Sequence, residues 1–381
     1  MRNKTGTRLS AALLGYMILV ILLLTLNPFY VVMPRHIAFT AQSDVYNFFS
    51  NILLFLPLGF FYRLTTGKRG ALWLGAVISF IVESVQIFMP ARTPSMLDVL
   101  ANALGAGLGA WIHTFIATRF AITRGALGQL RLETPLMGLV YLLIPLLWAD
   151  ALTLDASPNR WILTILIGVC GAILLSEIFQ HWWERVDFQI GAYGSIAAGI
   201  WFLIGSGPAY KQPVLVAMLG LAVISLTVIL MVLPRTSRER RFERATLRRV
   251  IPVFGLYLLL LALWYPLRPL TAWHASLGFT NRISETSLQV LYPRIEYLVA
   301  STILGYLLAE WRGRSETPLS RDLPRLFLYP FGIALLIEFL AGFQSGAGAS
   351  LIRAIMVVFS ALFGGTLYHF LRAHIRFLLG R

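Results

Sequence analysis

Twelve segments of mostly apolar residues, each about as long as a membrane-spanning helix, constrain the fold of this chain more than any other feature. A helix needs about 20 apolar residues to cross about 30 Å of hydrocarbon. The segments occupy residues 10–31, 47–64, 71–89, 96–117, 135–152, 160–180, 188–205, 213–233, 250–266, 291–311, 326–344 and 350–371. The sequence therefore predicts an all-α, polytopic transmembrane helical bundle with about 12 spans.

The scarcity of charged residues supports this fold class. Only 13% of the 381 residues are charged and 57% are hydrophobic, whereas about 25% of the residues of a typical soluble domain are charged. A chain of this length with so few charged residues could not cover a surface that faces water. These proportions exclude a soluble globular protein.

The net charge of +15 raises nucleic-acid binding as an alternative. However, the basic residues are dispersed over alternate connections. If the N-terminus is cytoplasmic, 24 of the 32 Lys and Arg residues fall in inner connections, seven in outer ones and Arg353 in the last span. Such an excess marks cytoplasmic connections. We therefore expect a multi-pass protein of the inner (cytoplasmic) membrane with both termini inside and no nucleic-acid partner. The densest basic segment, residues 235–249, is interpreted as a charged stop, with binding to anionic headgroups as the alternative.

Metal and cofactor chemistry is not expected. Cys170 lies within a span, and the six histidines show no metal-ligand spacing. The glycines of residues 105–109 lack the spacing of a phosphate-binding loop. We therefore predict no metal site and no cofactor.

Polar residues in the first four spans form the candidate functional site, because polar groups within a membrane are costly. Residues three or four positions apart share a helix face, and the expected topology puts all of these residues at the outer ends of their spans. Together they predict a polar pocket that opens outward. The candidate ligand-binding residues are Asn47, Asn51, Glu83, Gln86, Arg92, Asp98 and Asn102, and the candidates for close helix packing are Gly105 and Gly109.

The combined pattern within residues 10–120 resembles the VanZ-like family, which is named for an accessory protein of glycopeptide resistance. The motifs that carry the resemblance are Asn51…Phe55-x-Pro57-x-Gly59, Glu83-x-x-Gln86, Pro90-x-Arg92 and Asp98-x3-Asn102-x2-Gly105-x3-Gly109. The resemblance implies a four-helix membrane domain over residues 1–120 and a link to glycopeptide resistance.

Several functions agree with this pattern. The first expectation is that the protein handles or shields a lipid-linked cell-envelope component, with membrane lipids and a lipid-linked precursor or other amphiphile as partners. The second is a secondary transporter or lipid flippase coupled through Glu83. An enzyme that uses Glu83 and Asp98 as acid and base ranks last, because no nucleophile or metal accompanies them, and no catalytic residue is assigned. Structurally, Glu83, Gln86 and Asn102 could instead hold helices together, with Asp98 as an N-cap.

The C-terminal region, residues 250–381, resembles a degenerate second copy of the first domain, and residues 121–249 form a middle transmembrane segment that ends in the basic loop. Glu83 aligns with Glu338, and the residues Asp98, Asn102, Gly105 and Gly109 align with Arg353, Val357, Ser360 and Gly364. Since an arginine replaces the aspartate, we predict a buried Glu338–Arg353 ion pair. Ten of the 17 carboxylates, Asp150 among them, are expected in connections.

Overall fold

The computed structural model describes residues 4–26, 45–89, 93–119, 124–183, 189–233, 242–263, 270–276, 288–312, 318–345 and 348–378. The chain divides into two compact units. Unit 1 holds residues 1–128, 286–291 and 370–381, and unit 2 holds residues 129–285 and 292–369.

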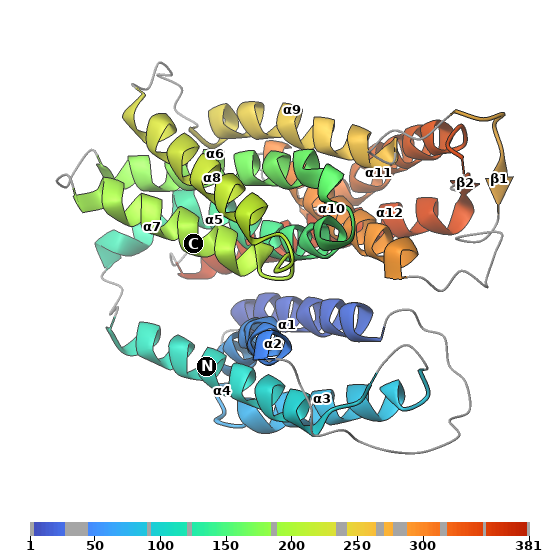
Figure 1. The fold of residues 1–381 in the computed structure, drawn as a ribbon. Coiled ribbons are helices and arrows are strands. Elements are labelled where there is room, and N and C mark those ends of the chain that lie inside the picture. The colour runs from blue at the N-terminus through green and yellow to red at the C-terminus, as the bar shows by residue number, and fades with distance from the viewer. Residues whose placement is uncertain are drawn as a thin grey trace. The chain divides into compact units, whose positions relative to one another are not determined.

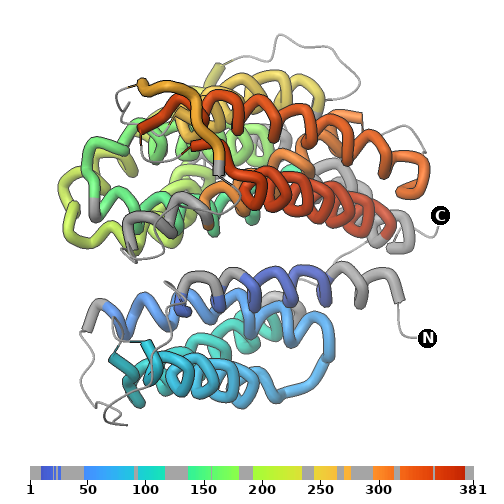
Figure 2. Tube along the Cα trace, turned by 90° about the vertical axis from the view of Figure 1, so that its right-hand side faces the viewer, coloured from blue at the N-terminus to red at the C-terminus, as the bar shows by residue number. Residues whose placement is uncertain are grey.

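Unit 1 contains a bundle of four helices, which lie side by side in both ribbon and tube views (Figure 1, Figure 2). Its core is formed by Ile21, Phe55 and Leu58, which are fully buried. A tight turn ends the second helix at Gly67, whose positive φ of 69° is readily adopted by glycine. The helices are α1 (Lys4–Thr25), α2 (Val45–Thr66), α3 (Ala71–Gln86) and α4 (Met96–Arg119).

Unit 2 contains most of each remaining helix and the short two-stranded element that Figure 1 shows at one end of it, whereas the helical residues 124–128, 288–291 and 370–378 belong to unit 1. The strands β1 (Ala275–Ser276) and β2 (Ala349–Ser350) pair in parallel. A short 3-10 helix, η1 (Pro158–Arg160), follows the first helix. The helices are α5 (Arg124–Ala156), α6 (Trp161–Trp183), α7 (Gln189–Ser206), α8 (Pro213–Val232), α9 (Phe242–Ala262), α10 (Leu288–Arg312), α11 (Leu319–Ala341) and α12 (Leu351–Leu378).

Each of the twelve predicted apolar segments overlaps one of the twelve α-helices found in the described ranges. The prediction of an all-α helical bundle is therefore confirmed, with β1 and β2 as a small departure from it. Among the described residues, seven helices are long and apolar enough to cross a membrane. The number of 12 membrane spans and the orientation with both termini inside stay predictions.

The outward-facing side chains of these helices are apolar. On α8, for example, the exposed fractions are 72% for Val214, 64% for Met218, 64% for Leu221 and 72% for Val232. Surfaces of this composition are stable in hydrocarbon, where helices satisfy their backbone hydrogen bonds internally. The chain is therefore a polytopic integral membrane protein.

Candidate functional site

The predicted site residues of α3 and α4 lie where several helices of unit 1 end or begin. The Gln86 Nε2 donates a hydrogen bond of 2.9 Å to the carbonyl oxygen of Thr25, the last residue of α1. The Glu83 Oε2 accepts a hydrogen bond of 2.8 Å from the backbone N–H of Ser95, just before α4. The C-terminal ends of α1 and α3 therefore meet the N-terminal end of α4.

Burial differs among the candidate ligand-binding residues. Glu83, Gln86 and Asn102 are buried, with exposed fractions of 3%, 8% and 3%. The side chains of Asn51 and Asp98 are half-buried and that of Asn47 is exposed. Arg92, the remaining candidate ligand-binding residue, lies outside the described residues. Asn47 and Asn51 both fall in the first two turns of α2.

Asp98 is not the N-cap of its helix, which corrects one of the structural interpretations. The helix α4 begins at Met96, so that Ser95 precedes it and Asp98 lies in its first turn. Serine is among the favoured N-cap residues, and it follows Pro94, which cannot donate a backbone hydrogen bond. A carboxylate in the first turn still interacts favourably with the helix dipole.

The hydrogen bonds of Glu83, Gln86 and Asn102 connect helices, as the structural interpretation predicted. The Asn102 Nδ2 donates to the Ser79 Oγ at 2.8 Å. Two buried atoms of this region, the Asn102 Oδ1 and the Ser95 Oγ about two helical turns before it, have no hydrogen-bond partner within the described ranges. Ser95, Asp98 and Asn102 are three and four residues apart and share one face. This face therefore offers unsatisfied polar atoms to a water molecule or a polar ligand group.

Close packing of α4 against α2 is confirmed for both predicted glycines. A Cβ atom added at Gly105 would overlap the backbone of Ile52, and one added at Gly109 would overlap the backbone of Leu56. Gly59 of α2 makes the reciprocal approach, because its Cβ would overlap the carbonyl group of Ala106. The absence of side chains at these positions lets the two helices touch through their backbones.

The same backbone contacts recur within unit 2, between α10 and α12. A Cβ atom at Gly305 would overlap the carbonyl group of Ala361, and one at Gly364 would overlap that of Thr302. The spacing also matches, since Leu56 and Gly59, like Thr302 and Gly305, are three residues apart in the sequence.

The predicted ion pair between Glu338 and Arg353 is confirmed. The Arg353 Nε lies 2.8 Å from the Glu338 Oε1, and the Arg353 Nη2 lies 2.7 Å from the Glu338 Oε2. The Glu338 and Arg353 side chains are 9% and 4% exposed. The Glu338 Oε2 also accepts a 2.6 Å hydrogen bond from the backbone N–H of Ser350, twelve residues later, as Glu83 does from Ser95. The Arg353 guanidinium lies 5.5 Å from the ring centroid of Tyr297.

A second group of buried charges in unit 2 was missed from the sequence. The Arg160 Nη2 lies 2.8 Å from the Glu296 Oε2, and the Thr153 Oγ1 donates to the Glu296 Oε1 at 2.9 Å. Asp150 accepts a short hydrogen bond from the Thr164 hydroxyl. We refer to Asp150, Arg160 and Glu296 as the buried charge cluster. Asp150 and Glu296 are wholly buried and Arg160 is 8% exposed.

The cluster corrects the expectation that Asp150 belongs to a connection. Asp150 lies within α5, and Arg160 ends η1 with its side chain buried. The sequence already indicated that Asp150 belongs to a helix, because it falls inside the predicted apolar segment 135–152. The Asp150 Oδ1 has no hydrogen-bond partner in the part of the chain that the structure describes.

In the described ranges, no three His, Cys, Asp or Glu side chains are close enough together to bind a metal ion.

Comparison with protein families finds a match to the VanZ/LLP1 family over residues 14–118. The comparisons with curated proteins and with solved structures found no match. The matched region covers α2, α3, nearly all of α4 and the second half of α1, so residues 14–118 are similar to the VanZ/LLP1 family, and the resemblance seen in the motifs is confirmed.

Proposed function

We propose that the polar helix ends of unit 1 bind the headgroup of a lipid-linked cell-envelope component at the outer face of the inner membrane, and that the protein handles or shields this component. The observation that carries the proposal is the face formed by Ser95, Asp98 and Asn102. Its buried Asn102 Oδ1 and Ser95 Oγ have no hydrogen-bond partner in the described ranges. Buried polar groups in native proteins are nearly always hydrogen-bonded. A polar headgroup would supply the missing donors.

In this proposal Glu83 positions the site and does not contact the ligand. Its carboxylate holds the backbone that leads into α4, and Gln86 holds the end of α1. Both are buried, whereas the half-buried Asp98 and Asn51 are placed to meet a molecule that enters from the membrane surface.

The family match supports a link to glycopeptide resistance, and this link provides a test. Expression in a glycopeptide-susceptible Gram-positive host should raise the minimal inhibitory concentration of teicoplanin. Asp98→Asn and Asn102→Leu should return that concentration to the value of the empty vector without lowering the amount of protein in the membrane. Thr114→Val is the matched control, because it is an exposed change on the same helix and the Thr114 hydroxyl donates to the Ala110 carbonyl one turn earlier.

Full protection by both site variants would reject the proposed pocket. Loss of protection together with loss of membrane protein would assign Asp98 and Asn102 to folding.

We further propose that residues 250–381 form a degenerate VanZ-like copy in which the site has become structural. The support is the recurrence of two backbone contacts and of the Glu–Ser hydrogen bond across twelve residues. In the copy, Arg353 stands at the position of Asp98 and lies beside Glu338 and Tyr297. Tyr297 corresponds to Asn51, because each lies eight residues before the glycine of the backbone contact, Gly305 or Gly59. By this correspondence Glu83, Asp98 and Asn51 would lie near one another in unit 1.

The second candidate function is a secondary transporter or lipid flippase coupled through intramembrane carboxylates. The buried charge cluster favours it, because the cluster holds two carboxylates and a single guanidinium and ionisable groups within spans often carry protons. In vesicles with the reconstituted protein, this function requires proton-dependent scrambling of a fluorescent envelope lipid that Asp150→Asn reduces at least tenfold. Scrambling at the rate of protein-free vesicles would reject it.

A further inference from the structure

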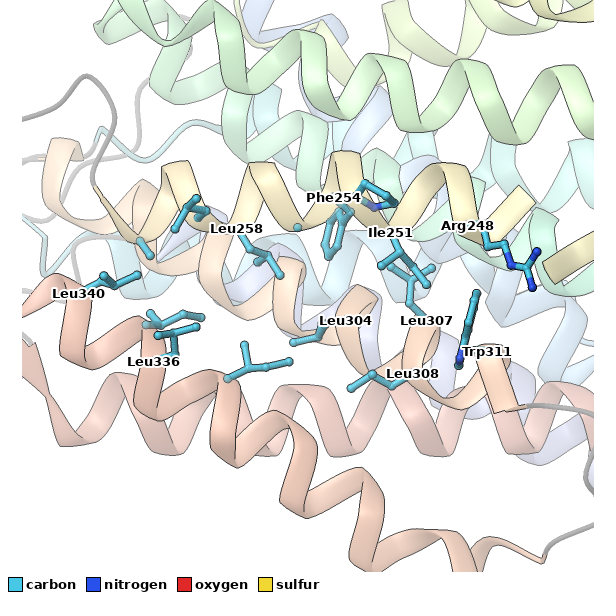
Figure 3. Close-up of a pocket in the computed structure, with 16 residues that line it drawn as sticks. Arg248, Ile251, Phe254, Leu258, Leu304, Leu307, Leu308, Trp311, Leu336 and Leu340 are labelled. Carbon is cyan, nitrogen blue, oxygen red and sulfur yellow. The ribbon is translucent and has the colours of Figure 1, made fainter. Parts of the chain in front are cut away.

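A groove between α9, α10 and α11 in unit 2 is separate from the site in unit 1 and from the buried charge cluster. It encloses about 580 Å³, which is within the range of about 300–1,000 Å³ typical of ligand sites. Aliphatic and aromatic side chains line most of it, with Phe254, Leu258, Leu304 and Leu336 among them (Figure 3). Any occupant must therefore be apolar over most of its length.

One end of the groove is polar. Figure 3 shows Arg248 and Trp311 together at this end and Leu340 at the other. Arg248 is the one charged residue among the described lining residues. From Arg248 to Ala262, α9 runs for about 21 Å at 1.5 Å per residue, whereas half of a 30 Å hydrocarbon core is about 15 Å. An acyl chain that enters from one membrane surface would fit along the groove.

The walls of the groove have exposed apolar side chains along the side that candidate membrane spans form. Leu259 and Leu336, on opposite walls, are 43% and 56% exposed. Both walls belong to candidate membrane spans, residues 244–262 and 319–341. Lipid chains can therefore enter sideways. If residues 250–381 are a copy of the first domain, α9, α10 and α11 correspond to α1, α2 and α3. The interface of α1, α2 and α3 has no such groove described, because Ile21, Phe55 and Leu58 pack into it.

We propose that this groove binds one acyl chain of an anionic phospholipid, whose phosphate lies at Arg248. The guanidinium supplies the complementary charge, and an arginine pairs well with phosphate oxygens. Arg248 belongs to the basic segment that the sequence places on the cytoplasmic side, where anionic lipids attract basic residues. The sequence left binding to anionic headgroups as the alternative interpretation of residues 235–249. In this proposal, that binding takes place at the C-terminal end of the segment, where Arg248 lines the groove and the adjacent Arg249 does not.

Native mass spectrometry of the purified full chain tests the proposal. The protein is incubated with dioleoyl phosphatidylglycerol or with dioleoyl phosphatidylcholine, which have the same chains and differ in headgroup charge. We expect phosphatidylglycerol to be retained about fivefold better, the ratio given by one basic residue near an anionic headgroup. Arg248→Gln should remove this preference, and Arg249→Gln should keep it, since Arg249 is also exposed on the same helix but does not line the groove.

A second pair of variants tests the acyl-chain half of the proposal. A side chain at Gly255 would enter the groove, and its Cβ meets no atom within 4 Å, so that Gly255→Leu should fold and exclude the lipid. Gly332→Leu is the control, because its Cβ is equally unobstructed and it does not line the groove. Equal retention by the Arg248 and Arg249 variants, or undiminished retention by Gly255→Leu, would overturn the proposal.

Discussion

Gly59→Ala should destabilise unit 1 strongly, although it adds a single methyl group. The added Cβ would overlap the carbonyl group of Ala106, and a backbone carbonyl in a helix cannot turn aside as a side chain can. The helices α2 and α4 would have to move apart. Overpacking of this kind costs about 1–3 kcal/mol and sometimes more, and we expect the upper end because backbone faces backbone. The midpoint of thermal unfolding in detergent is the measurement.

The matched control is Gly15→Ala on α1, where the Cβ would meet no atom within 4 Å. Alanine exceeds glycine in helix propensity by about 1 kcal/mol, so this variant should unfold at the same temperature or a higher one. The two variants are expected to change the unfolding temperature in opposite directions, which distinguishes the cost of backbone overlap from the gain in helix propensity. If Gly59→Ala unfolded no earlier than Gly15→Ala, α2 and α4 could not approach each other as closely as described.

Much of the fold could be predicted from the sequence because the strongest signals are local. An apolar segment of about 20 residues predicts its helix without knowledge of any neighbour, and each of the twelve segments overlaps a described helix. Stripes of small residues also act locally, so Gly105 and Gly109 identified the packing face of α4. The Glu338–Arg353 pair could be predicted since the alignment with Glu83 and Asp98 placed two opposite charges at facing positions.

The rest depends on contacts between residues that are far apart in the sequence. Arg160 and Glu296 are 136 residues apart, and each stands near the end of its span, where a charge commonly faces water. No periodic pattern in the sequence indicates that these two residues are in contact. The alternative that Asp98 is an N-cap was wrong because Ser95, another favoured N-cap residue, precedes the observed start of α4 at Met96. The α9–α10–α11 groove is a property of side-chain packing, which apolar periodicity does not determine.

Arg353→Met should be among the most destabilising single changes in unit 2. It leaves the carboxylate of Glu338 buried, with the Ser350 N–H as a described hydrogen-bond donor but without the opposite charge. Removal of one partner of a buried ion pair typically costs about 3–5 kcal/mol. Methionine has a similar length and is itself apolar, so that the loss reports the uncompensated charge more than a cavity. Thermal unfolding in detergent again measures the effect.

The double variant Glu338→Gln/Arg353→Met separates the role of the charge from that of the hydrogen bond. Glutamine still accepts from the Ser350 N–H, and no buried charge remains, so stability should return to within about 1–2 kcal/mol of the wild type, because neutral replacements of buried ion pairs are often nearly neutral in effect. If the double variant also retains protection against teicoplanin, the pair in the C-terminal copy serves the fold alone. Loss of protection in a stable double variant would instead extend the functional site to unit 2, and it would contradict the proposal that the copy has become structural.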